Sequence, residues 1–237
     1  MQSTLGEFQE TKSEQPFALQ NSKLLKVSLN QITIQAKAGA MVAYQGDVSF
    51  EHAGSGGMSR MLKKAMSGEG TTLMKMTGTG EVFLADTAQD IHLIYLENDA
   101  ITVNGANLLA FDAGIDWDIK KVEGVSGMMG GGLFNTALQG TGWVAIVSDG
   151  PPVLLQTGDV PTFCDPQAAI TWSSNLQTHV KADVNMKSLI GKGSGESLQI
   201  GFAGAGWVLV QPSEGRVAQQ TSSGGGGGGG LLGSLGG

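Results

Sequence analysis

Apolar and polar residues alternate along much of the chain, which is the pattern of half-buried β-strands. Residues 31–36 read Gln-Ile-Thr-Ile-Gln-Ala, so that every second side chain is apolar. Runs rich in β-branched and aromatic residues, such as 91–96 and 143–147, predict further strands because these side chains pack well on a pleated surface. Gln45-Gly46-Asp47 predicts a turn between two strands, and Asn104-Gly105 predicts a hairpin. We therefore expect an all-β fold.

One segment has the period of a helix instead. From Met58 to Met66, methionine, leucine and alanine side chains recur on one helical face, and Arg60, Lys63 and Lys64 occupy the other. Nine residues are too few to hold a helix alone in water, so this segment should pack on the β body. We expect one or two short helices in all.

Pairs of closely spaced glycines precede apolar strands at three places. The second glycine of each pair stands at position 80, 142 or 206, which gives spacings of 62 residues (80 to 142) and 64 residues (142 to 206). Such regularity predicts a β unit used three times, over about 17–92, 93–150 and 151–213. The six glycines have a structural interpretation, because glycine accepts positive φ and allows close backbone approach; they are Gly78, Gly80, Gly140, Gly142, Gly204 and Gly206.

These units predict a single compact domain over 17–213, with a polar, flexible arm before it at 1–16. After it, residues 214–237 contain an unbroken glycine run from Gly224 to Gly230. Such a tract does not recover its ordering entropy, so it should be a disordered tail.

The charge of the chain and its lack of targeting signals argue against several classes of function and location. The formal net charge is −7, whereas nucleic-acid-binding chains usually carry a basic face, so nucleic acid is an unlikely partner. The first sixteen residues lack the apolar core of a secretory signal and are too acidic for a mitochondrial presequence. No run is long and apolar enough to span a bilayer. The expected location is the cytoplasm.

Candidate chemical residues are scattered. His52, His92 and His179 lie far apart in sequence without close metal-type partners. The single cysteine, Cys164, has no histidine nearby and favours an inert thiol. The glycine pairs lack the Lys-Ser/Thr of a phosphate-binding loop. Carboxylates around Trp117 could bind a cation, although solvated charges are the simpler interpretation; they are Asp112, Asp116 and Asp118. We therefore expect no catalytic residue, metal or cofactor.

Several of these segments together resemble the altered-inheritance-of-mitochondria family, and specifically its bacterial members. They are Ala38–Ala43, the glycine frame from Gly68 to Leu84, Gly131–Phe134 and Gly140–Val144. The likeness runs from about Leu19 to Gly215. It implies a fold like that of the tryptophan RNA-binding attenuation protein, a double-stranded β-helix or sandwich with its unit repeated in one chain.

What the family implies for function is limited. Its mitochondrial members are linked to inner-membrane organisation and respiratory-complex assembly, whereas its bacterial members have no established activity. No family catalytic residues exist to carry over. Without a presequence the mitochondrial role does not transfer, and the attenuation protein's RNA and tryptophan sites have no matching residues here.

Three functional hypotheses follow. The first is a non-enzymatic binding or scaffold protein that uses its β surface and the 58–66 helix, with an unidentified protein or further copies of itself as partner. The second is a ligand-binding or enzymatic cavity served by His92, His179 and the Asp112–Asp118 group. The third is a peripheral membrane assembly factor, because Arg60, Lys63 and Lys64 opposite an apolar face could contact anionic lipid.

Overall fold

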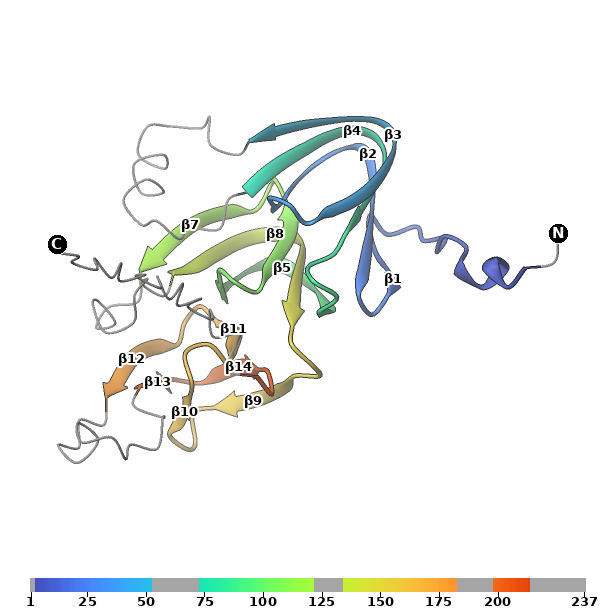
Figure 1. The fold of residues 1–237 in the computed structure, drawn as a ribbon. Coiled ribbons are helices and arrows are strands. Elements are labelled where there is room, and N and C mark those ends of the chain that lie inside the picture. Colours follow the sequence, from blue (N-terminus) through green and yellow to red (C-terminus); the bar gives the residue numbers. More distant parts are fainter. Residues whose placement is uncertain (1–2, 53–72, 122–133, 183–197, 214–237) are drawn as a thin grey trace, which may run out of the picture.

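The computed structural model describes residues 3–52, 73–121, 134–182 and 198–213, and strands dominate these ranges (Figure 1). The all-β prediction is therefore confirmed. A short 3₁₀ helix, η1, covers Leu5–Phe8. The strands are β1 Phe17–Asn21, β2 Leu24–Lys37, β3 Met41–His52, β4 Leu73–Leu84, β5 Asp90–Asn104, β6 Leu108–Asp112, β7 Asp116–Lys121, β8 Phe134–Ser148, β9 Val153–Thr157, β10 Thr162–Cys164, β11 Ala169–Ser173, β12 Gln177–Ala182, β13 Leu198–Ala203 and β14 Gly206–Val210.

Eleven of the strands in the described ranges form one sheet in the order β3-β4-β2-β6-β8-β5-β11-β14-β9. β1 pairs with β2 at one side of this path, and β7 pairs with β8. The remaining strands form a small sheet in the order β10-β13-β12. All pairings described are antiparallel. Figure 1 shows β2, β3 and β4 arching over one end of the molecule, with β9–β14 at the other.

The long strands are bulged where the glycine pairs lie. Opposite Gly78, the pairing of β2 with β4 shifts register, because Asn30 lies opposite Thr79 and Thr33 lies opposite Thr77. Opposite Gly142, the pairing of β5 with β8 shifts between Leu96 and Asp99. The third glycine pair follows β13 and begins β14. A bulge bends the strand that carries it, which lets a long sheet curl. Threefold repetition of the whole unit stays a prediction.

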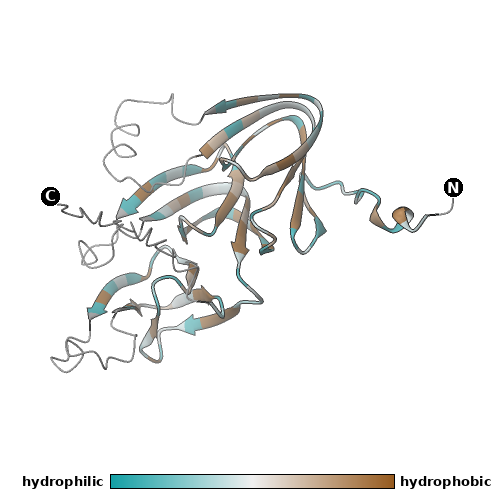
Figure 2. Ribbon diagram, viewed as in Figure 1, coloured by the Kyte–Doolittle hydropathy of each residue, from teal (hydrophilic) through white to brown (hydrophobic). Residues whose placement is uncertain are grey.

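Three apolar clusters fill the interior. The first lies among β1, β2, β4 and β6, around Phe17, Ile34 and Met76. The second contains Phe111, Val144 and neighbours from β5, β6 and β8. The third joins β11, β13 and β14 around Trp172 and Phe202. Figure 2 shows hydrophobic and hydrophilic residues interspersed along the strands. Successive side chains of a strand point to opposite faces, so one face of a strand can be apolar while the other is polar.

Two turn predictions were wrong. Residues 45–47 do not form a turn, because β3 runs through them and Gly46 takes a positive φ of 93° opposite Gly80. Asn104-Gly105 makes a turn but not a hairpin: the Asn107 N–H donates to the Asn104 carbonyl, yet β5 and β6 both pair with β8, which lies between them. A turn sequence determines only the local backbone geometry, and it does not decide which strands pair. Here the apolar strand β8 is buried between β5 and β6, so these two strands are not neighbours.

Two other predictions lie outside the described residues. These are the helix at 58–66, with Arg60, Lys63 and Lys64, and the glycine-rich tail at 214–237. No helix in the part of the chain that the structure describes is long and apolar enough to cross a membrane.

Candidate functional site

The first two glycines of interest, Gly78 and Gly80, let β3 approach β4 closely. Both have positive φ, and a Cβ on Gly78 would lie 2.1 Å from the carbonyl oxygen of Asp47. A Cβ on Gly80 would lie 2.0 Å from the carbonyl oxygen of Gln45. Because those obstacles are backbone atoms, no side-chain movement would relieve the clash.

The second glycine pair makes room for a carboxylate. A Cβ on Gly142 would lie 2.6 Å from Asp112 Oδ2, which accepts a hydrogen bond from the backbone N–H of Trp143. Burial raises the pKa of Asp112, and the hydrogen bond from Trp143 opposes that rise. Asp112, a candidate ligand from the sequence, therefore lies at the end of β6 and accepts from a backbone N–H in the middle of β8.

The third pair repeats this arrangement with a hydroxyl. Ser173 Oγ accepts a hydrogen bond of 3.1 Å from the Trp207 backbone N–H. A Cβ on Gly206 would lie 2.9 Å from the same oxygen. Gly204 has positive φ as well, and its carbonyl accepts a hydrogen bond of 2.9 Å from Thr157 Oγ1. Sequence analysis missed Ser173, because nothing near it in sequence marks it as a partner of residues 206–207.

His92 pairs with a serine that lies 56 positions further along the chain. The Ser148 hydroxyl donates to the Gly150 carbonyl at 2.7 Å, so the His92 Nε2–H donates to Ser148 Oγ at 2.8 Å. Burial lowers the pKa of His92, against the opposing charge of Asp90. Ser148 is fully buried and its proton is engaged, so this contact positions the imidazole rather than activating a nucleophile.

The other histidines and the cysteine lie elsewhere. His179, exposed on β12, meets the Phe163 ring edge-to-face above Gly201. His52 is the last residue of β3. Burial, and then the charge of Asp165, raise the pKa of the Cys164 thiol to about 12, which leaves it protonated at neutral pH and unreactive.

The candidate carboxylates do not converge on an ion. Asp116 and Asp118 lie on β7, opposite Gln139 and Ala137 of β8. In the described part of the chain, no three His, Cys, Asp or Glu side chains are grouped so that they could hold a metal ion. Hydrogen bonds described for His92 and Asp112 lead to Ser148 and Trp143, and none joins the two candidates to each other.

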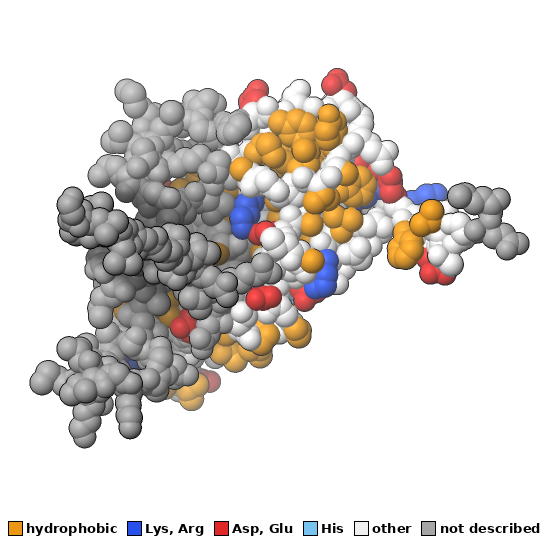
Figure 3. All heavy atoms as spheres, in the orientation of Figure 1, with side chains coloured by type: hydrophobic (Ala, Val, Ile, Leu, Met, Phe, Trp, Pro, Cys, Tyr) orange, Lys and Arg blue, Asp and Glu red, His pale blue; other side chains and the backbone are white. Residues whose placement is uncertain are grey.

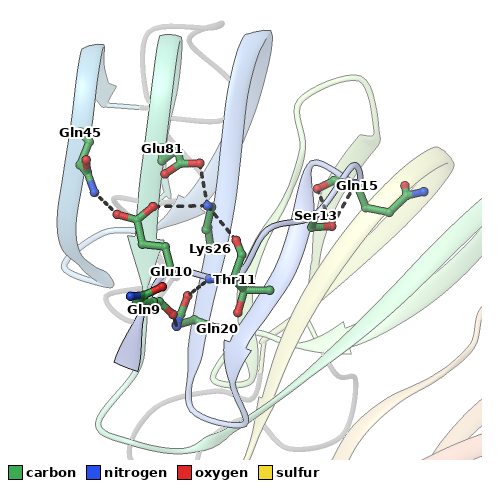
Figure 4. Close-up of polar contacts among 9 residues, drawn as sticks. All are labelled: Gln9, Glu10, Thr11, Ser13, Gln15, Gln20, Lys26, Gln45 and Glu81. Atoms are coloured by element: carbon green, nitrogen blue, oxygen red, sulfur yellow. Dashed lines mark hydrogen bonds and ion pairs between the residues drawn. The ribbon is translucent and has the colours of Figure 1, made fainter. Parts of the chain in front are cut away.

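A polar cluster attaches the N-terminal segment to the face of β2, β3 and β4 (Figure 4). Lys26 of β2 is only 6% exposed and contacts Glu81 of β4 at 2.7 Å. Its ammonium also donates to the Thr11 carbonyl at 2.9 Å and lies 3.5 Å from Glu10. Burial is the largest single influence and lowers the pKa of Lys26, but the hydrogen bonds and charges of Glu81 and Glu10 together hold it above its ordinary value.

Glu10 extends this cluster to the edge strand. Its carboxylate accepts a short hydrogen bond from the Gln45 side chain of β3, as Figure 4 shows. Gln20 of β1 holds the segment from the other side, through Thr11 N at 2.7 Å and Gln9 O at 2.9 Å. The segment predicted as a flexible arm thus makes five polar contacts, with Gln20, Lys26 and Gln45. One sequence signal pointed here: Lys26 is a lone charge between the apolar residues Leu25 and Val27.

Apolar side chains lie exposed beside this cluster. Figure 3 shows them gathered on the face over β2, β3 and β4. On β3, Val42 is 60% exposed and Tyr44 is 49% exposed. Tyr44 packs edge-to-face on Phe50 with ring centroids 5.1 Å apart. Among the described strands β3 pairs only with β4, so its other edge is open in this part of the chain.

A family model matches most of the chain. The model of the family described as Mitochondrial biogenesis AIM24 matches residues 17–213. The chain belongs to the AIM24 family. The resemblance seen in the sequence is therefore confirmed. A search of curated proteins gives no match.

A solved structure shares the AIM24 chain's fold. It is the crystal structure of a Streptococcus pyogenes protein, with a TM-score of 0.68 and 20% sequence identity. The alignment covers 82% of this chain and 91% of the streptococcal chain. At this identity the likeness supports the fold alone.

Proposed function

We propose that this AIM24 chain is a non-enzymatic scaffold protein that binds a second copy of itself through the open edge of β3. The observation that carries the proposal is the edge itself. Over residues 42–47 the strand is exposed on both faces, and no strand in the described ranges pairs with the backbone along its outer side. Open edges of this kind add a strand from another chain.

The composition of β3 offers little protection against such pairing. Natural edge strands are commonly blocked by lysine, proline or inward-pointing charge. β3 has no lysine and no proline, and its only acidic residues are Asp47 and Glu51, in its second half. Glu10 binds Gln45 on the face of the sheet, so the N-terminal segment rests on that face.

A second copy is the occupant that this edge fits most simply. Two β3 strands related by a two-fold axis run antiparallel, and each presents the same surface to the other. The apolar half of one strand, with Val42 and Tyr44, then faces the second half of the other. The interface needs no further partner, and it leaves the remaining faces of both copies available for binding.

The test is the molar mass in solution, measured by light scattering after size exclusion over a range of concentrations. We expect the unaltered chain to dimerise. Val42→Lys should weaken dimerisation by roughly tenfold or more, because it places two charges at the shared edge. Val160→Lys is the matched control: Val160 is 64% exposed but lies outside β3. A monomer at every concentration, or equal weakening by both variants, would overturn the proposal.

A further inference from the structure

A cavity with a volume of about 420 Å³ opens where loops from several strand ends meet. Its wall comes from Lys37 at the end of β2, residues 86–89 between β4 and β5, the turn 104–107, and single residues that follow β8, β10 and β14. Small-molecule sites commonly have volumes of roughly 300–1,000 Å³. Neither the glycine pairs nor the open edge of β3 contributes to this cavity.

Buried amides hold the wall in place. Asn107 Nδ2 donates to the Val147 carbonyl at 2.8 Å and to Gln211 Oε1 at 3.3 Å. Gln211 in turn accepts from the Asp149 backbone N–H and donates to the Gln167 carbonyl. Four segments distant in sequence are thereby joined by side chains that are almost completely buried. Because these amides are satisfied by protein partners, the cavity keeps its shape without a ligand.

The loop of residues 86–89 in the cavity wall is strained and fixed. Thr87 and Ala88 have positive φ of 45° and 58°, which is uncommon for residues other than glycine. Asp86, just before them, lies 2.6 Å from the ammonium of Lys37, and its carbonyl accepts from the Gln89 backbone N–H at 2.9 Å. Such strain persists where surrounding contacts over-determine it, and it is concentrated at ligand sites.

The lining has a definite chemistry. It contains five side-chain amides, one threonine hydroxyl, two carboxylates and one ammonium, and Ala106 is its single apolar residue. The one ammonium is already paired with Asp86, and Asp149 adds a further negative charge, so an anion would be repelled. An apolar ligand would desolvate these polar groups without compensation.

Three of the polar side chains remain available. Those of Thr87, Gln89 and Gln167 have no hydrogen-bond partner among the described residues, although all three line the cavity. Amide and hydroxyl groups both donate and accept hydrogen bonds. A ligand that fits them has groups that also donate and accept hydrogen bonds, as alcohol hydroxyl groups do.

We propose that this cavity binds a small, uncharged, polyhydroxylated molecule of about monosaccharide size. The Lys37–Asp86 ion pair forms part of the lining, and Asn107 and Gln211 fix the wall. Gln89 and Gln167 supply hydrogen bonds to hydroxyl groups. The ligand's lack of charge makes its affinity insensitive to ionic strength, because no ion pair is formed that salt would screen.

The experiment is a titration of the full chain followed by amide NMR, with D-glucose, D-ribose and myo-inositol as probes and with spermidine and inorganic phosphate as charged comparators. Site-specific shifts are needed because sugars stabilise proteins in general by exclusion from their surface. We expect at least one polyol at about 50 mM or less, the weak-affinity range, to shift the amides of residues 86–89 and 104–107.

The double variant Gln89→Ala/Gln167→Ala should bind that polyol about tenfold more weakly, since two hydrogen bonds to the ligand are lost. Gln156→Ala, at an exposed glutamine of β9, is the matched control and should bind normally. Raising the salt concentration should leave the affinity unchanged. The proposal is overturned if no polyol moves these amides, if the double variant binds as the control does, or if only spermidine or phosphate produces the shifts.

Discussion

At the scale of single residues, the missing side chains of the glycine pairs make room for two different kinds of neighbour. In β4 the missing side chain admits a neighbouring backbone, since Gln45 O and Asp47 O occupy the space. In β8 and β14 it admits a side chain that caps the next backbone N–H, Asp112 for Trp143 and Ser173 for Trp207. The sequence predicted a structural role for these glycines. It did not distinguish the two cases, because the obstacle comes from another strand.

Gly142→Ala should destabilise the chain by about 2–4 kcal/mol, because it combines backbone strain with overpacking against a half-buried carboxylate. The added methyl group would displace Asp112 and uncap the Trp143 N–H. Urea unfolding measures the change. Gly114→Ala is the matched control, since a Cβ there has no neighbour within 4 Å. Equal stability of the two variants would show that the close approach at Gly142 has no energetic consequence.

At the scale of elements, the N-terminal segment and the sheet face depend on one buried cation. Lys26 sits in β2 with its ammonium between Glu81 of β4 and the segment's Thr11 carbonyl. The segment itself contributes no buried apolar side chain in η1. Its attachment is therefore polar, and it depends on the few groups drawn in Figure 4.

Lys26→Met should release residues 3–16 from the sheet while keeping the buried apolar stem. We expect limited proteolysis within this segment to become roughly tenfold faster, which corresponds to about 1.4 kcal/mol less protection against local opening. Lys23→Met is the control, because its ion pair with Asp90 lies away from the segment. Unchanged cleavage in Lys26→Met would mean that the Gln20 contacts alone hold the segment.

At the scale of the whole molecule, one curled sheet carries both surfaces that we propose to be functional. The open edge lies at β3, and the cavity lies where β5 and β6 turn beside the segment after β14. The two ends of the sheet are joined by the short pairing of β5 with β11. The hydrogen bonds of Asn107 with Val147 and Gln211 reinforce that junction. The cavity therefore lies where the two ends of the sheet are held together.

The pH dependence of global stability should show the effect of His92. Its folded pKa is depressed by burial below the ordinary 6.5, so the unfolded chain binds this proton more readily. The associated stability is present above about pH 6.5 and is lost as pH falls toward the folded pKa. His92→Gln should reduce the loss of stability between pH 7 and pH 5, as measured by thermal unfolding. A profile unchanged in His92→Gln would contradict the assignment.

The sequence by itself determined the all-β class and the family, and it indicated the positions where glycine is required. Alternation and glycine spacing are local properties, and local backbone preferences produce them wherever the strands end up. Tertiary structure decided which strands are neighbours. It placed β8 between β5 and β6 despite the Asn104-Gly105 turn, and it paired His92 with Ser148. It also gathered the cavity from distant loops, because only packing brings residues far apart in sequence within hydrogen-bond reach.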